Sequence, residues 1–350
     1  MSTTMERPEE KQVPGRIPSR NDKAYSERMD RTGLWARVCA TAGAAAWAGM
    51  AVLARMLIVR VGGIELMFLF APLVIVPLAM ELGRELERTS SGGEWLANAA
   101  RWVQPFGAAA VVAAMWLPPG KRAALAALTW LLVCVLMASS GVMGLVRSPL
   151  RNAAGEAVAN ITLAVAKIDL AVGGAWLVAS RLGMRPMGVQ EPIGLLTAVH
   201  FHYAGFATAM IAAATLRFAA ERSRERWLKP VTLMVAGLPY VVAVGFVVSP
   251  ALKMAAGLLF SASVATLAVL LRSCAMRATN ASARILLQVA AGAVFVGMMF
   301  SGTYAIADFL GCNALTIPQM TRTHGLLNAV GFCLPGLLGW LVEGSSQRRA

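Results

Sequence analysis

The chain has 350 residues, of which 57% are hydrophobic and only 14% are charged, and its mean hydropathy is +0.62. Because soluble proteins are usually about one quarter charged, these values exclude an ordinary soluble protein and predict an integral membrane protein. The formal net charge of +14 would suggest nucleic-acid binding in a soluble domain, but here the basic residues lie between apolar runs, so no nucleic-acid partner is expected.

The chain is expected to consist of two tails and one helical bundle. Residues 1–33 are rich in charge and proline, so we expect a disordered cytoplasmic tail. Residues 34–342 are expected to form an all-α transmembrane bundle, and residues 343–350 a short cytoplasmic tail. About ten helices are predicted, each long enough to cross a hydrocarbon layer of about 30 Å. Their ranges are 34–56, 61–83, 98–118, 122–146, 156–180, 193–217, 230–249, 251–271, 284–309 and 322–342. An alternative for the pair joined by "SPALK" (249–253) is a single re-entrant segment.

The distribution of Lys and Arg predicts the orientation of the bundle. With the N-terminus inside the cell, the inside connections carry more basic residues than the outside ones, and "ERSRERWLK" (221–229) is the clearest inside loop. Short cytoplasmic loops are enriched in Lys and Arg. We therefore expect a multi-pass protein of a bacterial cell (inner) membrane, with both termini in the cytoplasm and the lipid bilayer as a partner.

Ionisable side chains inside the predicted spans mark candidate functional positions, because each costs about 2.5–3.5 kcal/mol on insertion scales. They are Glu65, Lys167, Asp169, His200, His202, Asp308 and His324. The predicted topology places all of them except Lys167 in the outer half of the bilayer. A polar site built from several helices is therefore expected there.

Helical spacing sorts these residues by face. Three pairs are three or four residues apart and share a face: His200 with Tyr203, Tyr304 with Asp308, and His324 with Asn328. His200 and His202 are two residues apart, about 200° around a helix, so they cannot both face one centre. We expect His200 to point with Tyr203 toward a cavity and His202 toward a neighbouring helix. The reverse assignment is also compatible with the spacing.

Two prolines five residues apart interrupt the second predicted helix, "LFAPLVIVPLAMELG" (69–83). Pro72 and Pro77 each remove a backbone hydrogen bond, so a kinked helix is predicted. Freed carbonyls need partners in a membrane, and such helices often line cavities. A bend that only improves packing is the alternative.

Three segments carry a family resemblance. "LTAVHFHYAGF" (196–206) and "RTHGLLNAVGF" (322–332) resemble the signature segments of the YndJ-like family of bacterial integral membrane proteins, and "APLVIVPLAMELG" (71–83) is similar in style. The resemblance implies a polytopic membrane protein, and it singles out His200, His202, Tyr203, His324 and Asn328. It implies no particular reaction.

The first functional hypothesis is an intramembrane enzyme that isomerises, cyclises or opens a ring in an amphipathic or isoprenoid-like, lipid-soluble small molecule. Such acid/base chemistry needs only positioned titratable groups and an apolar cavity, so no cofactor is predicted. Glu65 or Asp308 would be the general acid and His200 the base. The expected catalytic residues are Glu65, His200, Asp308 and His324, with Asp169, His202, Tyr203, Tyr304 and Asn328 in support.

Three other classes of protein fit the same residues. A proton-coupled transporter could use them as a relay, but the sequence shows no inverted repeat and no polar path to the cytoplasmic side. Histidines on separate helices could bind a metal or haem, although the HxxxH pair of intramembrane zinc hydrolases is missing. In the remaining alternative, the polar residues only join helices.

Overall fold

The structure is a computed structural model, and it describes residues 20–59, 61–87, 93–147, 154–222, 226–312 and 314–349. The described residues are helical apart from short connections, and none of them forms a strand. The predicted fold class, an all-α polytopic transmembrane bundle, is therefore confirmed.

The helices of the described ranges form ten long rods. The continuous rods are α1 (Arg20–Arg55), α4 (Glu94–Trp116), α5 (Lys121–Arg147), α6 (Ala154–Leu182), α9 (Leu228–Val248), α10 (Pro250–Ala275) and α11 (Ala281–Phe309). The other rods are composite and contain π-helical segments. They are α2 (Gly63–Phe70), η1 (Ala71–Ile75) and α3 (Val76–Leu86); α7 (Ile193–His200), η3 (Phe201–Ala207) and α8 (Thr208–Arg222); and α12 (Ile317–Met320), η4 (Thr321–Gly325), η5 (Leu327–Cys333) and α13 (Leu334–Arg349). A short 3₁₀ turn, η2 (Pro186–Gly188), precedes α7.

Nine rods of the described chain are long and apolar enough to cross a membrane. The tenth, α4, has 23 residues and packs along α5, but Glu94, Arg101 and Gln104 make it more polar. The prediction of about ten helices therefore agrees with the structure. The re-entrant alternative is wrong, because α9 and α10 are separate long helices. Ser249 is extended between them, and Pro250 opens α10.

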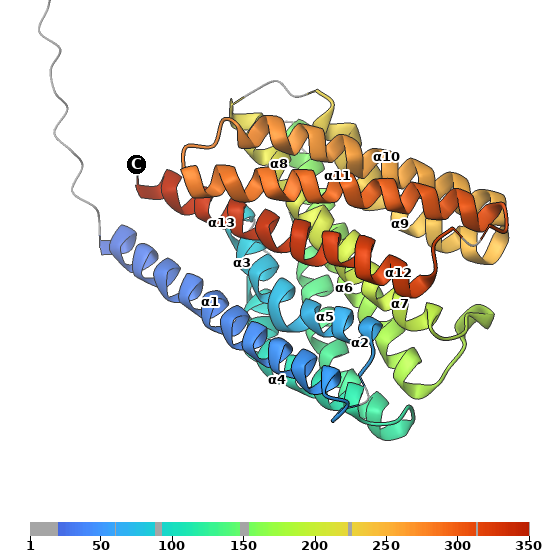
Figure 1. The fold of residues 1–350 in the computed structure, drawn as a ribbon. Coiled ribbons are helices and arrows are strands. Elements are labelled where there is room, and N and C mark those ends of the chain that lie inside the picture. Colours follow the sequence, from blue (N-terminus) through green and yellow to red (C-terminus); the bar gives the residue numbers. More distant parts are fainter. Residues whose placement is uncertain are drawn as a thin grey trace, which may run out of the picture.

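Figure 1 shows the arrangement of the rods. α9, α10 and α11 lie side by side along one side of the bundle, and α1, α4 and α5 lie on the opposite side. The start of α1 and the end of α13 lie at the same end, which we call the near end; the opposite end is the far end. Cytoplasmic termini would place the near end inside the cell, and this orientation stays a prediction.

The predicted terminal tails overlap with helices. α1 already begins at Arg20, within the predicted tail 1–33, and residues 1–19 lie outside the described residues. α13 continues to Arg349, through most of the predicted tail 343–350. The division into tail, bundle and tail stays a prediction.

Two of the three composite rods form the centre of the bundle. In the spans Gly63–Leu86 and Ile193–Ala219, 78% of the most apolar window is buried, whereas 22% is buried in the span of α1. α2 contacts α7 and η4, η3 contacts η1 and η5, and α13 contacts α3 and α8. The π-helical segments η1 and η3 therefore lie in the interior, where neighbouring helices can satisfy their backbone groups, whereas η4 has no buried residue.

The two prolines of the second span accompany the π-helical segment η1. Val76 donates its backbone N–H to the carbonyl of Ala71, five residues back, and Pro77 has no N–H to donate. The Pro72 carbonyl is therefore left without a partner in its own helix. The buried side chain of Gln104 on α4 donates from Nε2 to this carbonyl oxygen at 2.8 Å.

The same rod receives two further side-chain donors. The backbone N–H of Ala71 donates to the carbonyl of Phe68, three residues back, and Pro72 has no N–H to donate. The Met67 carbonyl is therefore also left without a backbone donor. The hydroxyl of Tyr203 on η3 donates to this carbonyl at 2.8 Å. The indole N–H of Trp47 on α1 donates to the carbonyl of Leu66, the residue before Met67, at 2.7 Å. Three neighbouring rods are thus tied to the backbone of α2 and η1.

We predict that Gln104→Leu lowers the free energy of unfolding by about 1–2 kcal/mol, because the Pro72 carbonyl would remain buried without a donor. Reversible unfolding in mixed detergent micelles would measure the change. Gln288→Leu is the matched control, since the Gln288 amide on α11 contacts only a thioether sulfur among the described residues. An equal change in the two variants would contradict the prediction.

Candidate functional site

Three of the predicted catalytic residues lie on elements that meet toward the far end of the composite rods. Glu65 is in the first turn of α2, His200 is the last residue of α7, and His324 lies in η4. α2 contacts both α7 and η4, and the two histidines are close enough to interact electrostatically. We call Glu65, His200 and His324 the far-end cluster.

The three histidines of the chain are oriented by the same kind of contact. Each Nδ1 atom lies within hydrogen-bonding distance of a backbone carbonyl oxygen: that of Leu196 for His200 (2.7 Å), that of Ala198 for His202 (2.8 Å) and that of Gly297 for His324 (2.9 Å). A carbonyl oxygen can only accept, so Nδ1 carries the proton of the neutral ring and Nε2 keeps its lone pair. The carbonyl contacts thus favour the tautomer with the proton on Nδ1 and direct Nε2 away from the carbonyl, although at His324 the Asn328 Nδ2 amide, also a donor, lies 3.1 Å from the same Nδ1.

The basic nitrogen of His202 is engaged inside the protein. His202 is fully buried, and the indole N–H of Trp130 on α5 donates to its Nε2 at 3.0 Å. The ring of Phe68 meets the imidazole edge-on, with centroids 4.8 Å apart, and Gly173 on α6 leaves no room for a side chain beside it. His202 therefore faces neighbouring helices and joins η3 to α5 and α6.

His200 and His324 differ from His202, because none of the described residues donates to their Nε2 atoms. His200 is exposed and His324 is partly buried. Asn328, one turn beyond His324, donates from Nδ2 to the His324 backbone carbonyl at 2.7 Å and supports the irregular turn. The two unengaged nitrogens can accept protons or donate a lone pair to a ligand.

Tyr203 does not join His200 at a cavity, contrary to the prediction from their spacing. Its side chain is buried, and its hydroxyl is bonded to the Met67 carbonyl of α2. The π-helical segment η3 begins at Phe201, and its wider turn changes the angle between successive residues. A spacing of three residues therefore does not bring Tyr203 onto the face of His200.

Asp169 lies apart from the far-end cluster, near the midpoint of α6. It is fully buried beside Gly205 of η3, one turn closer to the near end than Gly173. Neither carboxyl oxygen has a well-aligned hydrogen-bond partner among the described residues, although the Tyr240 hydroxyl on α9 acts on it electrostatically. Because such a group is costly in a membrane, Asp169 remains a candidate for a functional role.

Asp308 and Tyr304 also lie apart from the far-end cluster. Asp308 forms an ion pair with Lys253 of α10 at 2.6 Å, and Tyr304 lies one turn before it on α11. Gly297, which anchors His324, is three turns from Asp308 on the same helix, or about 16 Å. The predicted single site therefore divides, because Asp308 lies at the far end of α11, whereas the anchor of His324 lies about three turns further along the helix axis.

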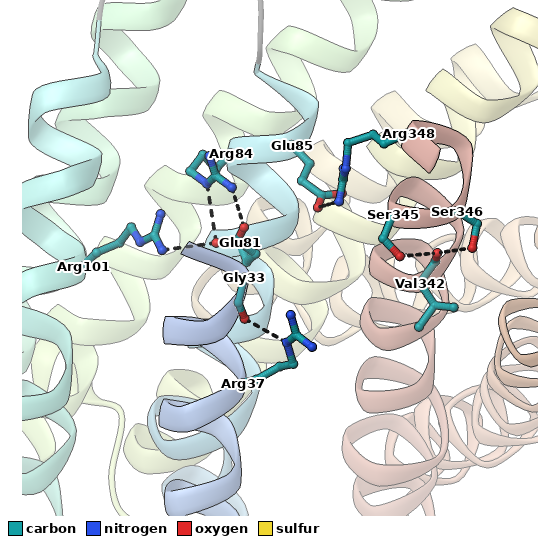
Figure 2. Close-up of polar contacts among 10 residues, drawn as sticks. All are labelled: Gly33, Arg37, Glu81, Arg84, Glu85, Arg101, Val342, Ser345, Ser346 and Arg348. Atoms are coloured by element: carbon teal, nitrogen blue, oxygen red, sulfur yellow. Dashed lines mark hydrogen bonds and ion pairs between the residues drawn. The ribbon is translucent and has the colours of Figure 1, made fainter. Parts of the chain in front are cut away.

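Another polar group, not included in the predicted site, lies at the near end (Figure 2). Glu81 on α3 is buried and pairs with Arg84 at 2.6 Å and with Arg101 of α4 at 3.2 Å. Glu85 pairs with Arg348 of α13 at 2.8 Å. The spacing of three residues between Glu81 and Arg84 is the sequence signal that could have identified this group. Its ion pairs join α3 to α4 and α13.

Lys167 also has a compensating partner. Its Nζ lies 2.7 Å and 2.8 Å from the two carboxyl oxygens of Glu87, which follows α3, and 3.2 Å from the Ser140 hydroxyl of α5. Lys167 itself is almost fully buried. The charge of this lysine is therefore neutralised across helices, which explains how it is accommodated within a span.

Metal binding was one of the expected alternatives. Within the described ranges, no group of three or more His, Cys, Asp or Glu side chains could hold a metal ion. Zinc sites in proteins use three or four protein ligands. The Nε2 atoms of His200 and His324 are two nitrogen donors that a metal or haem iron could use, so the described residues offer two such donors and no complete ligand set.

A groove of about 760 Å³ runs beside the composite rod that carries His324. Arg322 and Thr323, which directly precede His324, line it, and its other walls are apolar. The apolar lining includes Ala44, Trp47 and Ala48 of α1, Phe70 of α2, Phe300 of α11, and Leu326, Val330 and Leu334. The groove thus connects the neighbourhood of the far-end cluster with the side of the bundle where α1 lies.

These features define a class of protein: a polytopic α-helical membrane protein whose irregular central rods carry its histidines. The model of the YndJ-like protein family matches residues 66–332, and the chain belongs to this family. The resemblance seen in the sequence is thereby confirmed. The matched region contains both histidine-bearing segments, and Glu65 lies one residue before it.

One relative is a Bacillus subtilis (strain 168) protein with the name "Uncharacterized membrane protein YndJ". It is 32% identical over 179 residues, which are 50% of this chain and 32% of the relative. The matched part therefore spans about a third of the relative's length. No solved structure matches the chain. The comparisons agree with a multi-pass membrane protein and leave the membrane of residence and the orientation as predictions.

We predict that the Trp130–His202 hydrogen bond has a coupling energy of about 0.6 kcal/mol and not above about 1.7 kcal/mol, the average and the maximum found for side-chain bonds between membrane helices. A double-mutant cycle of Trp130→Phe and His202→Leu, followed by unfolding in mixed micelles, would measure it. His200→Leu is the control and should change the stability little, because His200 is exposed. A cycle with zero coupling would contradict the role assigned to His202.

Proposed function

We propose that the protein is an intramembrane acid/base enzyme that acts on an amphipathic or isoprenoid-like substrate at the far-end cluster. The observation that carries the proposal is the pair of neutral imidazoles, His200 and His324, whose Nδ1 atoms are held by carbonyls while their Nε2 atoms are unengaged. A general base needs such a free, directed lone pair.

The proposed chemistry uses one base and one acid. The Nε2 atom of His200 takes a proton from the substrate, and the Glu65 carboxyl gives a proton to another atom of the same molecule. The substrate is thereby isomerised, cyclised or ring-opened without a net change in atoms or electrons. Transfer of the proton from the imidazolium to the Glu65 carboxylate restores the starting state, and His324 is placed to relay it.

The surroundings favour Glu65 over Asp308 as the acid. The Asp308 carboxylate is paired with Lys253, whereas no ion pair of Glu65 occurs within the described part of the chain. Glu65 also lies on the rod that contacts the elements of both histidines. Asp308, with Tyr304, is therefore left outside the proposed catalytic group.

The apolar groove beside His324 supports a lipid-soluble substrate. Ligand pockets for small molecules are mostly apolar, with a few placed polar groups, and usually have volumes of about 300–1,000 Å³. The groove falls in this range, and its polar residues Arg322 and Thr323 adjoin the histidine. None of the cluster residues lines the groove itself, so in this proposal the apolar part of the substrate lies in the groove and its reacting part reaches past Thr323 to the cluster.

A proton-coupled carrier is a second candidate, favoured by Asp169. This carboxyl is buried halfway along α6 without a well-aligned partner, between the far-end cluster and the Lys167–Glu87 pair toward the near end. Titratable groups at such positions commonly mark proton paths. A proton-coupled carrier, unlike the proposed enzyme, needs titratable groups on both sides of the membrane midplane.

We predict that His200→Ala lowers substrate conversion by about 10²–10⁴-fold, because the general base is lost. Glu65→Gln should be similarly impaired. Lipid extracts of cells that lack the native gene and express each variant would be compared by mass spectrometry with those of wild-type cells. Asp308→Asn is the matched carboxyl-to-amide control and should keep the wild-type lipid profile. Wild-type profiles in both cluster variants would refute the proposed site.

The carrier candidate makes a different prediction. Proteoliposomes containing the protein would show a pH gradient that drives solute flux, and Asp169→Asn would abolish it, because the buried proton carrier is lost. Ser261→Ala, which removes a buried hydroxyl elsewhere in the bundle, is the control. If conversion requires His200 and Asp169→Asn retains it, the enzyme is supported over the carrier.

A further inference from the structure

The groove beside η4 and η5 has the length of a lipid chain and a cation at one end. It extends along the rod from Arg322 to Leu334, which is at most about 18 Å, because an α-helix rises 1.5 Å per residue and the wider π-helical turns of η4 and η5 rise less. One leaflet of the hydrocarbon layer is about 15 Å deep, half of about 30 Å. The groove therefore matches the depth of a single leaflet, with Arg322 at the far-end surface.

Arg322 is the charged residue of this groove, and it is unengaged. Its side chain is exposed, and no carboxylate of the described residues lies within ion-pair distance of it. Other arginines of the bundle, such as Arg84, Arg101 and Arg348, are paired with glutamates. A guanidinium forms two parallel hydrogen bonds with a phosphate, so its free donors suit this kind of headgroup.

The walls below Arg322 suit an apolar chain. Phe70, Phe300 and Leu326 line the groove, and the Trp47 ring is held in place by its bond to the α2 backbone. Leu326 and Val330 are exposed in the isolated chain by 42% and 40%, so they have apolar surface left for a ligand to cover. Arg322 at the surface can thus contact a lipid headgroup, and the apolar residues below it can contact the acyl chain of the same lipid in one leaflet.

From this arrangement, we infer that the groove binds an amphiphile with an anionic phosphate headgroup and one apolar chain in the groove, of the kind a membrane phospholipid supplies. The inference deepens the proposed function by naming the substrate class, and it rests on that function only in taking the bound amphiphile as the substrate. Binding itself requires Arg322 and the apolar walls and does not require the histidines.

Native mass spectrometry of the full-length protein would test the inference, with phosphatidylglycerol and phosphatidylcholine of identical chains as probes. Wild-type protein should retain the anionic lipid about tenfold better, equivalent to about 1.4 kcal/mol. Arg322→Gln should abolish this preference, whereas Arg122→Gln, an exposed arginine at the same end of the bundle, should preserve it. Equal retention of both lipids by the wild type, or an unchanged preference in Arg322→Gln, would overturn the inference.

A second pair of variants tests the apolar walls. Ala48→Leu adds bulk to the groove and should reduce retention of both lipids, whereas Ala46→Leu, on the opposite face of α1, should not. Equal retention in the two variants would also overturn the inference. His200→Ala separates the two proposals: it should lose conversion while keeping the lipid preference. Kept conversion with kept binding would refute the catalytic proposal alone.

Discussion

The need to satisfy backbone carbonyls inside a membrane organises this fold. The prolines of η1 and α3 free the carbonyls of Met67 and Pro72, and no water is present in the hydrocarbon to bond them. The hydroxyl of Tyr203 and the amide of Gln104 supply the missing donors from η3 and α4. Each donor reaches its carbonyl only if its helix lies close and at the right height. The central rod therefore sets the positions of its neighbours.

The same kind of contact produces the candidate site. Backbone carbonyls hold Nδ1 of every histidine, which directs each Nε2 away from its carbonyl anchor. His202 meets Trp130 there and becomes part of the packing. His200 and His324 meet no such donor among the described residues, so their basic nitrogens stay available. The same contact between Nδ1 and a backbone carbonyl thus occurs in a structural histidine, His202, and in the candidate base, His200. The two differ in whether a neighbouring helix supplies a donor to Nε2.

Hydropathy predicts most of the fold, because ten long apolar runs can be accommodated in lipid only as helices. The prolines at 72 and 77 also predict an irregular second helix. The donor Gln104 could not be predicted, since its role depends on where α4 packs. The two-residue spacing separates His200 from His202, whereas Tyr203 was misplaced because the π-helical register of η3 is a tertiary effect. Asp308 was grouped with the histidines by its predicted depth, and that depth was inaccurate, since three turns of α11 separate Asp308 from the anchor of His324.

The two ends of the bundle differ in how their charges are compensated. At the near end, Glu81, Glu85 and Glu87 all pair with basic side chains, which joins α3 to α4, α6 and α13. At the far end, Arg322 and the two histidines have donors and acceptors without partners among the described residues, at a cost to stability that paired groups avoid. Groups of opposite chemistry left unpaired beside one apolar groove can interact with a single amphipathic ligand. The ion pairs of the near end therefore stabilise the bundle, whereas the far end carries the binding site that we propose.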